Sequence, residues 1–380
     1  MAQSDYSEYM KKLENQLSDN TSPSNTVEET HISAYGGKHT RKKVRKSPFY
    51  RVIKVRPAAI ISVIAVIAII GVTVSVVTRR TSRINKAKNT DNNISSEAAL
   101  SARQSEQTEE PKMTYKFDND TAEIPASNDA GAAIIVNLNS HKVTAARNAD
   151  ERFYPASTTK IMTLLVAQEN IKSYDDTFTM TTDITDPLYV AEATVAGFLS
   201  GEVIKMTDLL YGTILPSGAD AAVGLANKIS GGEAQFVELM NKKVKELGLK
   251  NTHFTNVTGL FDKDHYSSAY DMAVILETAI QNPICRKILS TYQYRSNPTN
   301  KHPDGLLMSA TLFNYMYGTE PETATIVGGK TGFVNESGFC IASFGKNNTT
   351  ENEYIVVTFK NSSRWPAIHG QIDLYKQFVQ

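Results

Sequence analysis

The run PASTTKIMT, residues 155–163, is the stretch from which the architecture of this chain can be worked out. It places the hydroxyl of Ser157 three residues before the amine of Lys160, at the start of an apolar-periodic segment that predicts a helix to about residue 170. Residues three apart share one helix face, so Lys160 Nζ can reach Ser157 Oγ. Pro155 suits a helix start, where free N–H groups favour a developing oxyanion. The run predicts a nucleophile beside its base, although S-x-x-K alone is common by chance.

The composition excludes some classes of protein. Forty basic and 40 acidic residues among 380 leave no net charge that would draw the chain as a whole to nucleic acid. Two cysteines, Cys285 and Cys340, are too few for a disulfide framework, and we expect them to be unpaired and buried. His253 and His265 lack the acidic or cysteine partners that would complete a metal site, so structural hydrogen bonding is expected.

An uncharged apolar segment covers residues 57–77. Twenty-one residues at a rise of 1.5 Å reach about 32 Å, which is enough to cross a bilayer core, so we expect a transmembrane helix over residues 57–78. Nine Lys or Arg residues precede the span within 20 residues and five follow it, which predicts a cytoplasmic N-terminus and an exported remainder. The expected location is therefore the cell membrane, crossed once.

This span divides the chain into four parts. Residues 1–56 form a polar tail, basic near the membrane, that we expect to be disordered and cytoplasmic. Residues 79–111 have no sustained apolar period and predict a flexible extracytoplasmic stalk. Residues 112–380 are long enough for one catalytic domain.

The domain has strand patterns at its two ends and helical patterns between them. Strands are predicted at 132–138, 142–146, 325–330, 338–344 and 354–359, and helices at 205–215, from Pro216 to about Ile229, 235–247, 269–280 and 365–379. This order predicts an α+β domain with a mostly antiparallel sheet built from the N-terminal and C-terminal strands and a helical subdomain between them.

Two further motifs accompany Ser157 and Lys160. Ser217-Gly218-Ala219 lies in a loop between helices, 60 residues after Ser157, and Lys330-Thr331-Gly332 lies at the end of a predicted strand, 113 residues later. S-x-x-K, an S-D-N-like triplet and K-T-G form the motif set of class A β-lactamases and penicillin-binding proteins. All three in this order, on a helix, a loop and a strand, are not expected by chance.

Longer blocks around these motifs extend the match. From about residue 130 to residue 380 the chain resembles the low-molecular-weight penicillin-binding proteins that act as serine D-Ala-D-Ala carboxypeptidases. The resemblance rests on YPASTTKIMT at 154–163, LLYG at 209–212, NTHFTN at 251–256, HYSSAYDM at 265–272 and KTGF at 330–333. It implies a β-lactamase/penicillin-binding transpeptidase-like fold, removal of the terminal D-Ala from peptidoglycan pentapeptide stems, and acylation by β-lactam antibiotics, without a cofactor or metal.

The resemblance also implies roles for the catalytic residues. Ser157 attacks the D-Ala–D-Ala carbonyl to give an acyl-enzyme, and Lys160 takes the serine proton. Lys160 must be neutral for this, so we expect burial and the nearby cation Lys330 to lower its pKa. Ser217 relays a proton to the leaving amine. The N–H groups of Ser157 and Phe333 form the oxyanion hole.

The remaining roles concern substrate binding. Lys330 and Thr331 are expected to bind the free carboxylate of the terminal D-Ala, and Gly332 lets the substrate backbone pair along the strand edge. Arg364 resembles a family arginine near the carboxylate site, with a solvated surface arginine as the alternative. The family often carries a further C-terminal β-rich domain and anchor, which are not expected after Gln380.

One position departs from the family pattern. The family has S-x-N at the second motif, and here Ala219 replaces the Asn that holds the lysine side and the acyl amide of the substrate. Either Asp220 or water compensates, or turnover is slowed. Two alternatives to the carboxypeptidase therefore stand: a non-catalytic or weakly active penicillin-binding cell-wall module, and a β-lactamase.

Overall fold

The computed structural model describes residues 114–316, 318–319 and 321–380. The predictions for the tail, the membrane span and the stalk lie outside the described residues. Within the described part of the chain, no helix has both the length and the apolar character needed to cross a bilayer.

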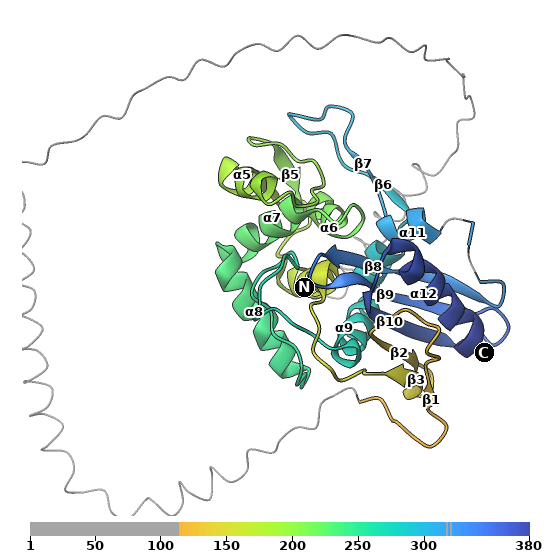
Figure 1. The fold of residues 1–380 in the computed structure, drawn as a ribbon. Coiled ribbons are helices and arrows are strands. Elements are labelled where there is room, and N and C mark those ends of the chain that lie inside the picture. The colour runs from red at the N-terminus through yellow and green to blue at the C-terminus, as the bar shows by residue number, and fades with distance from the viewer. Residues whose placement is uncertain (1–113, 317, 320) are drawn as a thin grey trace, which may run out of the picture. The chain divides into compact units, whose positions relative to one another are not determined.

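A six-stranded sheet in the order β1-β3-β2-β10-β9-β8 forms the centre of the domain (Figure 1). β1 runs parallel to β3, and every other pair in this sheet is antiparallel. Pairing of β2 with β10 joins the N-terminal hairpin to the C-terminal strands, and β8 is left at one edge. The strands are β1 (Ala122–Glu123), β2 (Ala132–Asn137), β3 (Lys142–Arg147), β8 (Ala324–Val334), β9 (Gly338–Asn347) and β10 (Glu353–Asn361).

Helices cover both faces of this sheet. α12 (Arg364–Phe378) and α11 (Thr311–Met316) pack on one face, and α9 (Ala269–Gln281) and α10 (Pro283–Ser290) pack on the other. The helical subdomain between the strand groups contains α5 (Thr182–Val190), α6 (Met206–Ile214), α7 (Ala219–Ser230) and α8 (Glu233–Glu246). The 3-10 turn η1 (Ala156–Thr159) and α4 (Lys160–Asn170) connect the two regions, because η1 packs on β8 while α4 packs on α6, α7 and α9.

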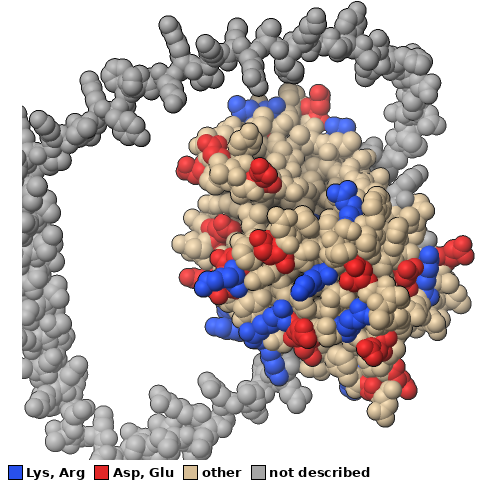
Figure 2. Space-filling model, viewed as in Figure 1, with Lys and Arg blue, Asp and Glu red and all other residues tan. Residues whose placement is uncertain are grey.

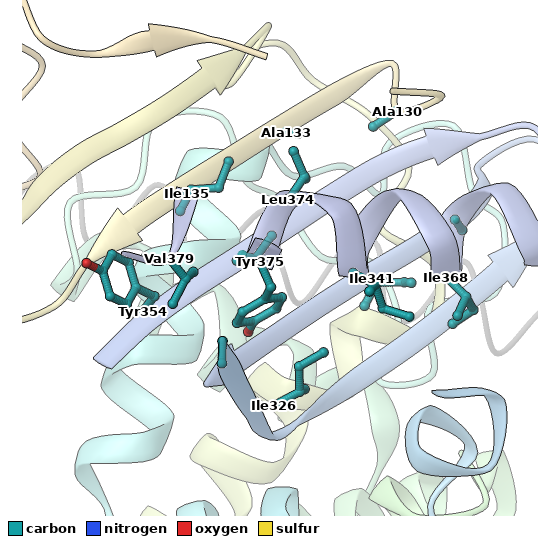
Figure 3. Close-up of a cluster of buried hydrophobic side chains, with 14 of the residues drawn as sticks. Ala130, Ala133, Ile135, Ile326, Ile341, Tyr354, Ile368, Leu374, Tyr375 and Val379 are labelled. Carbon is teal, nitrogen blue, oxygen red and sulfur yellow. The ribbon is translucent and has the colours of Figure 1, made fainter. Parts of the chain in front are cut away.

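Alternation along the strands builds the core beneath α12. Ile135, Ile341 and Val356 point to the α12 side, where Ile368 and Tyr375 pack against them (Figure 3). Their intervening neighbours point to the opposite face, since successive strand residues face opposite sides. The sheet is therefore buried on both faces. Its edge strand β8 packs against η1.

The fold class and most predicted elements are confirmed. The helix predicted from Ser157 begins with a 3-10 turn, and β8 continues to Val334, so Lys330 lies within the strand rather than at its end. Cys285 and Cys340 are both free and buried. The sequence prediction missed three short helices and two two-stranded sheets. The helices are α5, α10 and α11, and the sheets pair β4 (Thr177–Thr179) with β5 (Val203–Lys205) and β6 (Gln293–Arg295) with β7 (Leu307–Ser309).

Candidate active site

The Ser157 hydroxyl and the Lys160 amine meet at the junction of η1 and α4. Lys160 Nζ lies 3.0 Å from Ser157 Oγ and donates a hydrogen bond to the Thr258 carbonyl at 2.6 Å. Lys160 is only 2% exposed. When the amine is neutral, the Thr258 carbonyl occupies one N–H, and the lone pair remains for the proton of Ser157.

Burial sets the protonation state of this amine. Loss of hydration lowers the pKa of Lys160 from 10.5 to about 7, while the carboxylate of Asp220 acts in the opposite direction. The predicted contribution of Lys330 needs correction. Burial, followed by the positive charge of Lys160, holds the pKa of Lys330 well below its ordinary value. The causes of the shift at Lys160 are burial and Asp220, and Lys330 is not among them.

The turn 256–260 forms the wall behind the nucleophile. Asn256 Oδ1 accepts hydrogen bonds from the N–H of Thr258 at 3.1 Å and of Gly259 at 2.7 Å, and its Nδ2 donates to the Leu260 carbonyl at 3.0 Å. Gly259 has a positive φ of 78°, and a Cβ there would lie 1.9 Å from the Ala156 carbonyl oxygen. The turn therefore presses directly on η1 and directs the Thr258 carbonyl at Lys160.

His265 supports the same turn from behind. The Thr255 N–H donates to His265 Nδ1 at 3.1 Å, so Nε2 carries the hydrogen and donates to Thr159 Oγ1 at 2.8 Å. Burial lowers the pKa of His265 to about 4, which keeps the ring neutral. His265 thus has the structural hydrogen bonding that was expected. Sequence reasoning gave Thr258, Asn256 and His265 no part in the site, although the blocks NTHFTN and HYSSAYDM contain or adjoin them.

Strand β8 approaches the nucleophile closely. A Cβ at Gly332 would lie 2.7 Å from Ser157 N and 3.1 Å from Thr158 N, so only glycine fits at this point. Val334 N–H donates to Ser337 Oγ in the turn toward β9. Because N–H groups of successive strand residues point to opposite edges, the Phe333 N–H points to the free edge beside Ser157. This is the placement required of the second oxyanion donor.

The predicted carboxylate-binding residues differ in environment. Lys330 is 2% and Thr331 7% exposed, and Lys330 Nζ donates to the Thr331 carbonyl at 2.7 Å. Arg364 is exposed at the start of α12, and its guanidinium lies over the Tyr315 ring at 4.5 Å. The described contacts of Arg364 do not link it to Lys330 or Thr331.

The second motif is held by the loop that precedes it. Ser217 is 8% exposed with a φ of 65°, and a Cβ at Gly218 would lie 2.7 Å from the backbone nitrogen of Ala196. The Asp220 carboxylate accepts three backbone N–H bonds from residues 196–198 at 2.7–3.1 Å. Asp220 therefore fixes this loop rather than replacing the amide that Ala219 lacks.

Charge outside the site is mixed in sign. On the face shown in Figure 2, Lys and Arg side chains are interspersed with Asp and Glu. No group of three or more His, Cys, Asp or Glu residues in the described part of the chain is arranged to hold a metal ion.

The chain resembles known proteins in sequence. The sequence profile of the D-alanyl-D-alanine carboxypeptidase family matches residues 119–363. D-alanyl-D-alanine carboxypeptidase DacF of Bacillus subtilis (strain 168) is 36% identical over 228 residues, which are 58% of this chain and 55% of the relative. The chain spans about half the length of these curated relatives.

Solved structures share the fold. Penicillin binding protein 5 from Haemophilus influenzae superposes with a TM-score of 0.59 and 29% identity, covering 67% of this chain and 71% of that one. The Streptomyces K15 DD-transpeptidase superposes with a TM-score of 0.58 and 26% identity, covering 65% of this chain and 97% of that one.

Proposed function

Because the chain belongs to the D-alanyl-D-alanine carboxypeptidase family, we propose that it removes the terminal D-Ala from peptidoglycan pentapeptide stems through an acyl-enzyme on Ser157. The observation that carries the proposal is the 3.0 Å contact between Ser157 Oγ and a Lys160 amine whose pKa is about 7. At pH 7 about half of the molecules hold that amine neutral, against about one in 3,000 at a pKa of 10.5. β-Lactams acylate the same serine in this proposal.

Substrate binding changes the protonation state of the two active-site lysines, Lys160 and Lys330. The terminal carboxylate of the stem lies at Lys330 and Thr331, and an opposite charge raises the pKa of Lys330. Lys330 then becomes protonated, and its charge keeps Lys160 neutral by repulsion. The carboxylate that marks a chain end thereby prepares the base, which favours exopeptidase over endopeptidase action.

Acylation follows from the positions of the backbone donors. Ser157 Oγ bonds to the carbonyl carbon of the penultimate D-Ala as its proton passes to Lys160. The N–H groups of Ser157 and Phe333 stabilise the oxyanion. Collapse of the tetrahedral intermediate breaks the peptide bond, and the leaving amine takes the proton from Lys160 by way of Ser217. Water then hydrolyses the ester and releases the shortened stem.

The proposed location is the outer side of the cell membrane. Residues 57–78 anchor the chain to the bilayer, with the N-terminus in the cytoplasm and the catalytic domain extracytoplasmic. The stalk 79–111 sets the reach of the domain toward its peptidoglycan substrate. The substrate chemistry supports this arrangement, because stem peptides of the wall lie outside the membrane.

D-Ala release from a pentapeptide tests the activity. Residues 112–380 should release D-Ala, and Ser157→Ala should abolish both release and labelling by fluorescent penicillin. Lys160→Arg keeps a cation but removes the base, so acylation should fall by at least a hundredfold. Retained acylation in Lys160→Arg would remove the general-base role.

Ala219 favours one second candidate, a weakly active penicillin-binding cell-wall module. Fluorescent penicillin labelling without D-Ala release would support it, and absence of both would indicate a non-catalytic module. Release of the penicilloyl adduct within seconds would instead identify a β-lactamase.

A further inference from the structure

A groove of about 390 Å³ lies at the end of the β8–β9 hairpin. Three cations, Arg152, Lys263 and Lys360, line it together with Tyr154 from the segment before the nucleophile. The hairpin turn contributes Glu336, the one acidic residue in the lining. The groove thus combines an excess of positive charge with aromatic surface.

Two of these cations have no carboxylate within ion-pair distance among the described residues. The Arg152 guanidinium lies over the Tyr266 ring at 4.6 Å and donates to Asn251 and to the Lys250 carbonyl, which leaves its Nη1 without a protein acceptor in the described part of the chain. Lys360 Nζ lies over the Phe153 ring at 5.7 Å. Lys263 differs, because it contacts Asp264 at 3.6 Å.

The position of the groove follows from the direction of a bound substrate. With its terminal carboxylate at Lys330 and its scissile carbonyl at the Phe333 N–H, a stem must leave the site past Phe333. Beyond Phe333 the edge strand reaches the turn at Glu336 and Ser337, which lines the groove. The other wall begins at Tyr154, three residues before Ser157. The acyl side of the stem is therefore directed at the groove.

Two aromatic pairs lie along the expected path of the substrate from Ser157 to the groove. Phe333 is 49% exposed and stacks on Phe339 with ring centroids 4.5 Å apart. Phe261 is 46% exposed and contacts Tyr154 edge-on at 4.9 Å. Both exposed rings offer apolar contact to a substrate that passes from Ser157 to the groove.

We propose that this groove binds a carboxylate on the acyl side of the stem, carried by the residue two positions before the one that supplies the scissile carbonyl. The inference rests on the proposed function, because that function sets the direction of the substrate. Arginine presents a planar set of donors that matches a carboxylate, and Lys360 adds a second charge. In a pentapeptide stem the residue concerned is the second.

The lengths agree with this assignment. From Phe333 to Glu336 and Ser337, which line the groove, is three to four residues, or at most about 10–14 Å at the rise of a strand. Two residues of an extended substrate span about 7 Å. A carboxylate at the tip of the second residue's side chain adds the few ångströms that remain and reaches the groove.

Matched substrates and variants test the groove. D-Ala release is measured for a stem pentapeptide with a free carboxylate on its second residue, for the same peptide amidated there, and for a short acyl-D-Ala-D-Ala. Arg152→Gln and Lys360→Gln should each lower kcat/KM about two- to fivefold for the carboxylate peptide, through KM, and leave the other two substrates unchanged. Lys172→Gln, which removes an exposed lysine outside the groove, is the matched control, and acylation by benzylpenicillin checks that the catalytic residues are intact.

The outcomes separate the two proposals. Equal kcat/KM for the carboxylate and amidated peptides in the unmodified chain would overturn the groove assignment while leaving the carboxypeptidase proposal in place. Absence of release from all three substrates would overturn the carboxypeptidase proposal. Binding of both pentapeptides to Ser157→Ala is therefore measured as well, where tighter binding of the carboxylate form, lost in Lys360→Gln, supports the groove and equal binding refutes it.

Discussion

Replacement of Lys160 by methionine should stabilise the domain while abolishing acylation. Burial lowers the pKa of Lys160 from 10.5 to about 7, which at about 1.4 kcal/mol per pH unit corresponds to a cost of about 5 kcal/mol at or below pH 7. Methionine is close in volume and carries no charge. It leaves the Thr258 carbonyl unpaired, which costs about 1–3 kcal/mol. The net expectation for Lys160→Met at pH 6 is a gain of about 2–4 kcal/mol in the free energy of unfolding.

The pH dependence distinguishes this cause from a general packing effect. Between pH 7 and 10.5 the unfolded chain binds a proton at Lys160 that the folded chain does not, so the stability of the unmodified domain rises with pH. The advantage of Lys160→Met should therefore shrink by up to about 1.4 kcal/mol per pH unit across this window. Well above pH 7 Lys160 is neutral in the folded unmodified domain, so its charge no longer acts on Lys330 in that part of the window.

Urea unfolding of residues 112–380, with and without Lys160→Met, measures this difference at several pH values from 6 to 10. Penicillin labelling checks that acylation is lost in the variant. A stability difference that stays constant from pH 7 to 10 would show that Lys160 keeps its ordinary pKa in the folded state, and the account of the neutral base would fail.

Three other changes follow from the same contacts. The rate at which penicillin acylates the unmodified domain should rise with pH around a midpoint near 7. Asp220→Asn removes the charge that raises the Lys160 pKa, so it should move this midpoint to lower pH. An unchanged midpoint would contradict this role of Asp220. Gly332→Ala places a Cβ 2.7 Å from Ser157 N. The acylation rate should therefore fall at least tenfold, and the free energy of unfolding measured in urea should fall by about 1–3 kcal/mol. An unchanged acylation rate would show that η1 can move away from the added methyl group without loss of function. Ala219→Asn should raise the rate of D-Ala release about tenfold, which corresponds to one substrate hydrogen bond of about 1.4 kcal/mol, and should leave the pH midpoint unchanged. An equal or slower release would show that an amide at this position does not contribute to turnover.

The periodicity of apolar residues predicted the helices and strands that are long enough for their buried positions to repeat several times. α8 has an amphipathic repeat, and β2, β9 and β10 are apolar runs between turn residues, so their types were predictable from sequence. α10 repeats its buried positions at Ile284, Cys285, Ile288 and Leu289, but it has only eight residues, and α11 has six, so each is shorter than the window in which a repeat is sought. α5 contains Pro187 as its sixth residue, in the helix interior, where proline is disfavoured because it removes a backbone hydrogen bond.

The motif residues of the site could be named from the sequence, whereas the Thr258 carbonyl beside Lys160 and the electrostatic coupling between the lysines could not. Ser157, Lys160 and Lys330 carry distinctive groups at motif spacing. The direction of the Lys160–Lys330 coupling depends on which amine is more strongly desolvated, and both lie at 2% exposure. No sequence pattern states that order, and the shift at Lys160 comes from burial and Asp220 rather than from Lys330.

The effect of Ala219, which stands where the family has Asn, could not be predicted from the sequence either. An Asn at this place serves two contacts, one toward the lysine and one toward the acyl amide of the substrate, and the side chains nearby offered Asp220 as its substitute. Asp220 is fully used by the N–H groups of residues 196–198. The Thr258 carbonyl instead takes the lysine contact at 2.6 Å, held by the turn that Asn256 organises. Since a main-chain carbonyl already orients Lys160, what Ala219 removes is the substrate contact alone. The departure should therefore weaken turnover of peptides while leaving the nucleophile and its base fully prepared.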